Sequence, residues 1–305
     1  MAGAVWGRYK RAMTMNGYRQ IGIVGAGRVA QALALGLGPH SAAPVMLWGR
    51  SQDRLENVVK QAGRATTAER LETLVGACDL IGIAVSDDAL ASVAAAMAAA
   101  MPRGRAPFVF HVSGRSGAAL LDPLRAGGAL TAAIHPVMTF TGDPGTEVQR
   151  MSGARFAITG ADAEATAAAR DVVCCLGGVG VDIAEAHRPL YHAALCHAAN
   201  HLVTLLEGSF DALRGAGVDD PAGLLAPLVR AALENSLEHG FSALSGPLLR
   251  GDEETIAGHL EALAGHRPEI LPPYRAMALA TLDALERSGA SVPPALRARL
   301  DQPRR

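Results

Sequence analysis

Apolar and polar positions follow two different patterns along the chain. Up to about residue 185, short apolar runs alternate with amphipathic stretches, which is typical of a parallel sheet with crossover helices. After His187 the short apolar runs stop, and only helical periodicity continues. The pattern therefore predicts an α/β fold, in which a Rossmann-type, mostly parallel sheet is followed by a second, all-helical domain.

The individual elements can be placed from the same pattern. Strands are expected at 20–24, 45–48, 80–85, 108–112, 129–134, 156–159 and 181–183. Helices are expected between them at 28–37, 52–61, 87–101, 118–125 and 163–176, and in the second domain at 189–216, 223–240, 253–264 and 272–287. This gives an extension at 1–18, a Rossmann-like domain at 19–185 and a helical domain at 186–305.

Composition excludes several classes of protein. The 305 residues carry 28 Lys and Arg against 29 Asp and Glu, so no electrostatic attraction to nucleic acid is expected. Glycine and charged residues interrupt every apolar run before it reaches membrane-spanning length. The four cysteines have neither metal-ligand nor disulfide spacing, which predicts a reduced, cytoplasmic protein without a metal site. The first 18 residues contain three basic side chains and no apolar run, so they do not form a signal peptide.

The first predicted strand runs directly into a Gly-x-Gly-x-x-Ala sequence that opens a helix. Its first glycine permits a tight turn, its second leaves room for a pyrophosphate beside the backbone, and the alanine lets the helix pack closely on the strand. The free N–H groups at the helix start favour phosphate oxygens. The same pattern also occurs at ordinary strand–turn–helix joints, but here it begins a long βαβ series. The predicted cofactor-binding residues of this loop are Gly25, Ala26, Gly27, Arg28 and Val29.

The end of the second predicted strand bears on which dinucleotide is bound. A site for NAD places an acidic residue about 20 residues after the glycines, whereas this chain has Arg50 and Ser51 there and no carboxylate before Asp53. Guanidinium and hydroxyl groups both donate hydrogen bonds to a 2′-phosphate, which predicts NADP. The alternative is a solvated arginine and a serine that caps the next helix. After the third strand, Val85, Ser86 and Asp87 are also predicted to bind the cofactor, or else to cap a helix.

Histidines follow two further strands. His111 precedes Ser113, and His135 precedes a proline; each histidine could be catalytic or a hydrogen-bonded structural residue. On the first helix of the second domain, His192, Cys196 and Asn200 are four residues apart and would share an α-helical face, with His197 and His201 beside them. Asn235 lies in a later helix, and Arg250 lies in a turn before another helix.

Several blocks in one order give the chain a resemblance to a known family. It resembles predicted NADP-dependent oxidoreductases that join a Rossmann-like domain to a helical domain of unknown function, related to the 6-phosphogluconate dehydrogenase-like enzymes, ketopantoate reductases and pyrroline-5-carboxylate reductases. The resemblance implies the fold and a reduced nicotinamide cofactor. Because such relatives commonly dimerise through the helical domain, it also implies a homodimer. The matching blocks are 22–30, 83–88, 111–114, 135–140, 156–160, 191–200, Asn235, 246–252 and His259.

The chain departs from these relatives in the residue that would supply a proton. Hydroxyacid dehydrogenases and ketopantoate reductases use a lysine on the first long helix of the second domain, but the only lysines here are Lys10 and Lys60. A histidine must then donate the proton if a carbonyl is reduced. We expect His192 or His135 in this role.

The remaining site residues follow from this expectation. Asn200 would hold the substrate oxygen or the carboxamide, and Ser113 and Arg250 would anchor a carboxylate. The expected activity is NADPH-dependent reduction of a small carbonyl substrate, a ketopantoate-like 2-oxo acid, at the cleft between the domains. The alternatives are an imine reductase of the pyrroline-5-carboxylate type and a non-catalytic NADP(H)-binding sensor.

Overall fold

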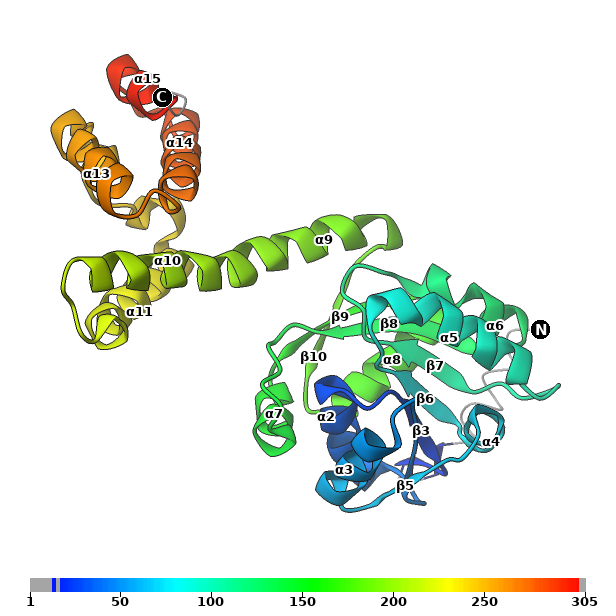
Figure 1. Cartoon of the computed structure of the whole chain (residues 1–305). Coiled ribbons are helices and arrows are strands. Elements are labelled where there is room, and N and C mark those ends of the chain that lie inside the picture. Colours follow the sequence, from blue (N-terminus) through cyan, green and yellow to red (C-terminus); the bar gives the residue numbers. More distant parts are fainter. Residues whose placement is uncertain (1–12, 15–16, 302–305) are drawn as a thin grey trace. The chain divides into compact units, whose positions relative to one another are not determined.

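The computed structural model describes residues 13–14 and 17–301 (Figure 1). Most of the predicted extension at 1–18 lies outside these residues. By their internal contacts the described residues fall into two units, which divide between Leu195 and Cys196. The sheet and helix α9 (Arg188–Leu195) belong to the first unit, and each unit is described by itself.

The first unit is built on an eight-stranded sheet in the order β10-β9-β8-β7-β6-β3-β4-β5. All neighbouring strands are parallel except β8 and β9, so the predicted mostly parallel sheet is confirmed. The strands are β3 (Ile21–Val24), β4 (Val45–Trp48), β5 (Ala65–Thr67), β6 (Leu80–Ile83), β7 (Phe108–His111), β8 (Leu130–Pro136), β9 (Arg155–Gly160) and β10 (Val179–Asp182).

Side chains alternate across the sheet and form a separate core on each face. In β7, Phe108 and Phe110 point into one core and Val109 into the other, as the two-residue period of a strand requires. The first core is closed by α2 (Arg28–Leu37), α3 (Gln52–Ala62) and α8 (Ala163–Cys175). The second is closed by α4 (Leu71–Ala77), α5 (Asp87–Ala100) and α6 (Asp122–Ala126). This three-layer arrangement holds the carboxyl ends of β3, β6 and β7 at one edge of the sheet.

Strand β5 and helices α4 and α7 are among the elements of this unit that were not predicted from the sequence. Strand β5 is three residues long and largely polar at the edge of the sheet, so it lacks an apolar run. Helix α4 buries Leu71, Leu74 and Val75, which have helical spacing, but the helix is only seven residues long. Helix α7 (Pro144–Met151) does carry start signals, because Asp143 caps its N-terminus and proline occupies its first position.

The described residues of the second unit, 196–301, form helices and no strands, as predicted. Its core is formed by side chains of α13 (Glu253–His266), α14 (Leu271–Arg287) and α15 (Pro294–Asp301). The other helices are α10 (His201–Gly215), α11 (Pro221–His239) and α12 (Pro247–Arg250). The prediction of one α-helix over 189–216 is wrong in one respect, because the segment Cys196–Asn200 is a π-helix. A π-helix closes its hydrogen bonds over five residues instead of four, so the α-helical spacing that assigned His192, Cys196 and Asn200 to one face does not hold across it.

Candidate active site

The glycine-rich turn after β3 has the geometry of a phosphate-binding loop. Gly25 has a φ of +130°, and a Cβ at this position would lie 2.2 Å from the Ala84 carbonyl oxygen, so only glycine fits. Gly27 is the N-cap of α2 and faces open space. No side chain caps this helix, and its first turn contains no acidic residue. The helix start therefore leaves backbone N–H donors and the positive end of the helix dipole available to an anion.

A cavity of about 400 Å³ extends from this loop along the ends of β4 and β6. Arg50, one of the predicted cofactor residues, lines it, and so does Arg54, which was not among the predicted site residues. Among the described residues, neither arginine forms an ion pair. Two guanidinium groups without ion pairs, one after β4 and one at the start of α3, suit a phosphate better than the hydroxyl of an unsubstituted ribose. The lining residues are Gly25, Ala26, Gly27, Trp48, Gly49, Arg50, Ser51, Arg54, Ala84, Val85, Ser86, Ala89, Ser92 and Val93.

Three of the predicted cofactor residues do not line this cavity. Arg28 lies beside the loop that follows β8, where its guanidinium donates to the Phe140 carbonyl oxygen at 3.1 Å. Val29 packs against the first core of the sheet. Asp87, in the first turn of α5, forms an ion pair with Arg115 at 3.2 Å.

His111 is fully buried, and both of its ring nitrogens are used within its own loop. Nε2 donates to the Gly117 carbonyl oxygen at 2.9 Å, and Nδ1 accepts from the Ser113 N–H at 3.1 Å. The carbonyl can only accept, so the proton is on Nε2 and the ring is neutral. Burial lowers the pKa of His111 to about 4. These contacts are those of a structural histidine that shapes the turn after β7.

His135, near the end of β8, is paired with Tyr191 of helix α9. Its Nδ1 lies 2.7 Å from the Tyr191 hydroxyl oxygen, and the two rings meet edge to face. Burial, followed by the charge of Arg188, lowers the pKa of His135 to about 4, and burial raises the pKa of Tyr191 to about 12. At neutral pH the pair therefore consists of two uncharged groups that share one hydrogen bond.

Gly114 brings His135 and His192 together. The two rings are 6.2 Å apart and nearly perpendicular. A Cβ on Gly114 would lie 2.6 Å from Cδ2 of His192 and 3.0 Å from Nε2 of His135. Both histidines predicted from the sequence as proton donors thus border the space next to Gly114. A side chain at position 114 would fill that space.

Beneath this cluster lies Arg188, which the sequence analysis did not select. Its side chain is fully buried, and its guanidinium carbon lies 5.8 Å from the centre of the Tyr191 ring. Its nitrogens donate to the Thr159 hydroxyl at 2.7 Å and to the carbonyl oxygens of Ala133, Ala157 and Ser113 at 3.1, 3.0 and 3.4 Å. The side chain joins strands β8 and β9 and the turn after β7 to the start of α9. An arginine before a proline is an ordinary helix start in the sequence, so nothing signalled its burial.

The backbone and hydroxyl groups of Ser113 form hydrogen bonds in and around the turn after β7. Its carbonyl accepts from Arg188, its N–H donates to His111, and its hydroxyl accepts from the Ser116 N–H at 3.3 Å. The side chain is buried. These contacts position the turn after β7, next to Gly114.

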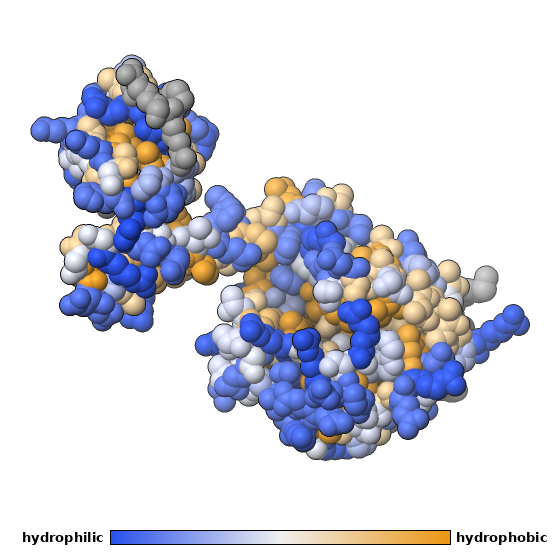
Figure 2. All heavy atoms as spheres, viewed as in Figure 1, coloured by the Kyte–Doolittle hydropathy of each residue, from blue (hydrophilic) through white to orange (hydrophobic). Residues whose placement is uncertain are grey.

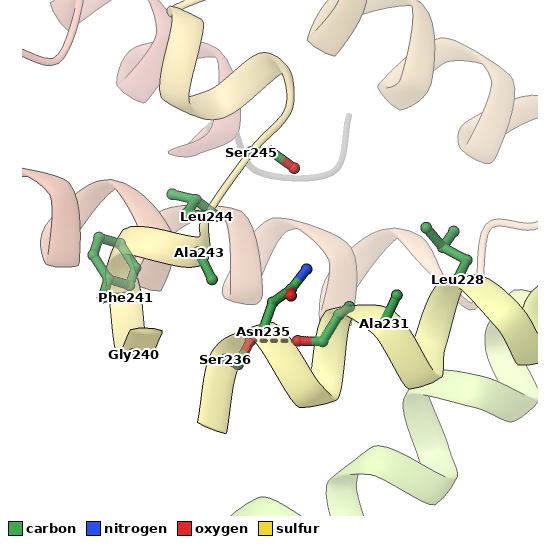
Figure 3. A pocket seen from close by; sticks show the side chains of 10 residues that line it. Leu228, Ala231, Asn235, Ser236, Gly240, Phe241, Ala243, Leu244 and Ser245 are labelled. Carbon is green, nitrogen blue, oxygen red and sulfur yellow. Dashed lines mark hydrogen bonds between the residues drawn. The ribbon is translucent and has the colours of Figure 1, made fainter. Parts of the chain in front are cut away.

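The other predicted site residues belong to the second unit. Asn200 ends the π-helical segment, and Arg250 ends α12. Asn235 lines a cavity of about 570 Å³ formed by α11 and the turn that follows it. In Figure 3, the Asn235 amide points into this cavity between Ala231 and Ser245.

A further cavity of about 540 Å³ lies between α10, α13 and the start of α14. It contains His259, whose Nδ1 is 2.9 Å from the Tyr274 hydroxyl oxygen. Burial raises the pKa of Tyr274.

Comparison with protein families identifies the two parts of the chain. One family model, described as a Rossmann-like domain, matches residues 11–136, and another, described as domain of unknown function DUF2520, matches residues 154–281. The chain therefore joins a Rossmann-like domain to a DUF2520 domain, which confirms the resemblance drawn from its sequence. A comparison with curated protein sequences gives no match.

Solved structures with the same fold include oxidoreductases. A Bacteroides fragilis protein described as an NADP oxidoreductase has a TM-score of 0.70 and 19% identity, over 87% of this chain and 98% of that chain. A reductive aminase from Aspergillus terreus, in complex with NADPH4, cyclohexanone and allyl amine, has a TM-score of 0.64 and 18% identity, over 93% and 98%. A pyrroline-5-carboxylate reductase from Coxiella burnetii has a TM-score of 0.56 and 15% identity, over 93% and 98%. At these identities the similarity establishes the fold.

Proposed function

We propose that this protein is an NADPH-dependent oxidoreductase that reduces a small carbonyl substrate, with a 2-oxo acid as the leading class. The observation that carries the proposal is the hydrogen-bonded pair His135–Tyr191 at the same sheet edge as the glycine-rich loop. In an open α/β sheet, ligands bind beyond the carboxyl ends of the strands. A loop suited to phosphate and a group able to handle a proton are both found there.

The residues around the loop fit NADP. Backbone N–H groups of Gly25–Gly27 and the start of α2 would hold the pyrophosphate, and Arg50, Ser51 and Arg54 would hold the 2′-phosphate. When bound in its reduced form, NADPH supplies a hydride. The protein then has to orient the substrate and provide a proton to its oxygen.

The geometry changes our assignment of the proton donor. The low pKa of His135 keeps this ring neutral at pH 7, so it cannot act as a cationic acid. We assign proton transfer to Tyr191, with His135 as the hydrogen-bond partner that orients its hydroxyl. His192, the other donor expected from the sequence, would hold the substrate oxygen from the other side of Gly114.

Paired variants distinguish these roles. Removing an acid at the reacting atom costs about 10²–10⁴-fold, so Tyr191→Phe should lower kcat within that range. His192→Ala should lower it by about tenfold, and both variants should keep NADPH affinity within about threefold. The reverse order of the two losses would return the donor role to His192.

The activity itself is tested by measuring NADPH oxidation against a panel of 2-oxo acids and cyclic imines. Turnover of a 2-oxo acid supports the proposal. Tight NADPH binding without consumption across the panel would contradict it and favour a cofactor-binding sensor.

Imine reduction is a second candidate. The reductive aminase and the pyrroline-5-carboxylate reductase named above share this fold, and a protonated imine needs less help from an acid. The same panel separates the two candidates, because an imine reductase would consume NADPH with cyclic imines and leave the 2-oxo acids unchanged.

A homodimer is part of the proposal. Helices α10, α11 and α12 and the turn after α11 expose large apolar side chains, and hydrophobic surface is visible on the helical unit in Figure 2. So many exposed apolar side chains on neighbouring helices favour a second copy as their partner. The exposed residues are Leu202, Val203, Leu205, Leu224, Leu228, Leu233, Leu237, Phe241 and Leu249. Among the described helices, none has the length and apolarity to cross a membrane, and a cytoplasmic location is proposed from cysteine usage alone.

A further inference from the structure

Arg188 places a full positive charge inside the sheet domain. Its side chain is completely buried, and its hydrogen bonds go to one hydroxyl and three carbonyl oxygens, all of them neutral. Among the residues that the structure describes, no carboxylate forms an ion pair with it. Arginine cannot lose its proton in a protein, so burial cannot neutralise this charge.

The acidic groups nearby do not cancel the charge at the site. The charge of Glu185 acts on Arg188 and opposes the lowering of the Arg188 pKa by burial. Glu185 is exposed to solvent, however, and its carboxylate accepts a hydrogen bond from the Ala119 N–H. Asp87 is paired with Arg115. Tyr191 is uncharged at neutral pH, because burial raises its pKa to about 12. His111 and His135 are held neutral by burial, so none of these groups brings a negative charge.

The positive charge of Arg188 acts on His135 and Tyr191, the pair that would face the substrate. The Arg188 guanidinium lies 5.8 Å from the Tyr191 ring centre. After burial, it is the largest cause that holds the pKa of His135 down, and it opposes the rise in the pKa of Tyr191. Both effects have the sign of a positive potential at the His135–Tyr191 pair.

We propose, on the basis of the function proposed above, that Arg188 selects the substrate class by favouring a carbonyl over a protonated imine. Hydride addition to a carbonyl carbon breaks its π bond and leaves the electron pair on oxygen as an alkoxide, which takes a proton from Tyr191. A positive potential stabilises that oxyanion as it forms. An iminium ion carries positive charge before reduction, so the same potential opposes its binding. Arg188 touches neither substrate nor cofactor in this scheme and acts as a positioning and electrostatic residue.

The sharpest test leaves Arg188 in place and changes its partner. The Thr159 hydroxyl accepts from Arg188 Nε, so Thr159→Asp adds a counter-charge there, whereas Thr159→Asn adds nearly the same volume without charge. A second pair of variants is Arg188→Gln, which removes the positive charge, and Arg188→Lys, which keeps it. We expect the ratio of kcat/KM for a 2-oxo acid to that for a cyclic imine to fall about 10–100-fold in Thr159→Asp and Arg188→Gln. In Thr159→Asn and Arg188→Lys the ratio should stay within about threefold of the unmodified protein.

Two measurements without turnover accompany the kinetics. Imidazole NMR should show the pKa of His135 moving up toward its ordinary value in Thr159→Asp relative to Thr159→Asn. Oxamate, a stable anionic analogue of a 2-oxo acid, should bind the protein without cofactor about tenfold more weakly in the Asp variant. The inference would be overturned if the pKa of His135 shifts but the ratio of kcat/KM for the two substrates, or the affinity for oxamate, stays unchanged. That result would leave the reductase proposal intact. Absence of any turnover in the unmodified protein would instead contradict the reductase proposal, and oxamate affinity would still test the charge.

Discussion

Gly114 offers the most direct test of how the candidate site is built. Its φ is not in the left-handed region, so the effect of Gly114→Ala depends on space alone. The new methyl group would lie 2.6 Å from the His192 ring and 3.0 Å from the His135 ring, whereas ordinary contacts begin at 3.4 Å. The rings must therefore retreat by about 0.8 and 0.4 Å. A displacement near 1 Å in a catalytic group can cost about 10²-fold.

We expect Gly114→Ala to lower kcat by about 10–100-fold, which corresponds to about 1.4–2.7 kcal/mol in the activation barrier. Overpacking should also lower the free energy of unfolding by about 1–3 kcal/mol. NADPH affinity should stay within about threefold, because Gly114 is not among the residues that line the cofactor cavity. Stopped-flow measurement of NADPH oxidation, cofactor titration and urea unfolding give the three values.

The control is Gly265→Ala, which adds the same methyl group in helix α13, where nothing lies within 4 Å. This variant should keep full activity and gain about 0.5–1 kcal/mol of stability, because glycine is the costlier residue inside a helix. Combining Gly114→Ala with His192→Ala should give less than the sum of the two losses, because the methyl group then has one ring fewer to displace. Full activity in Gly114→Ala alone would refute the proposed arrangement of the two histidines.

Three further outcomes are expected. The unmodified protein should prefer NADPH over NADH by about 1–3 kcal/mol in titrations with both cofactors, and Arg50→Glu, with or without Arg54→Glu, should remove this preference. Equal affinities for the two cofactors in the unmodified protein would contradict the assignment of these arginines to the 2′-phosphate. Burial keeps the pKa of His111 and His135 at about 4 in the folded protein against 6.5 ordinarily, so below pH 6.5 the unfolded chain binds protons that the folded protein does not. The free energy of unfolding should then fall as pH drops from 6.5 toward 4, and the loss should be about 2 kcal/mol per histidine at pH 5. Urea unfolding at pH 7.5 and pH 5 measures this loss, and equal free energies of unfolding at the two pH values would contradict it. Leu237→Glu, at a side chain that is 80% exposed, should convert a dimer to a monomer in light scattering without unfolding it, and a monomeric unmodified protein at micromolar concentration would rule the dimer out.

The sequence by itself determined the class of fold and the cofactor loop. Both depend on residues close together in the chain: a buried strand, two glycines that permit one turn, and a helix that starts at the second glycine. All seven strands predicted from apolar runs are present in the sheet. The central strands β3, β6 and β7 are buried along their whole length, and a strand buried on both faces needs such a run. Strand β5 was missed because a short polar edge strand depends on its neighbour β4 rather than on its own residues.

Only the tertiary structure decided which partners surround the histidines at the strand ends. His111 and His135 look alike in the sequence, since each lies at the end of a predicted strand. Folding gives His111 two backbone partners within its own turn, whereas His135 meets Tyr191 from a helix 56 residues away. Arg188 reads as an exposed helix start until its guanidinium is seen to bond carbonyls on two strands. Such roles depend on burial and on hydrogen bonds between distant segments, and a local pattern of residues contains neither.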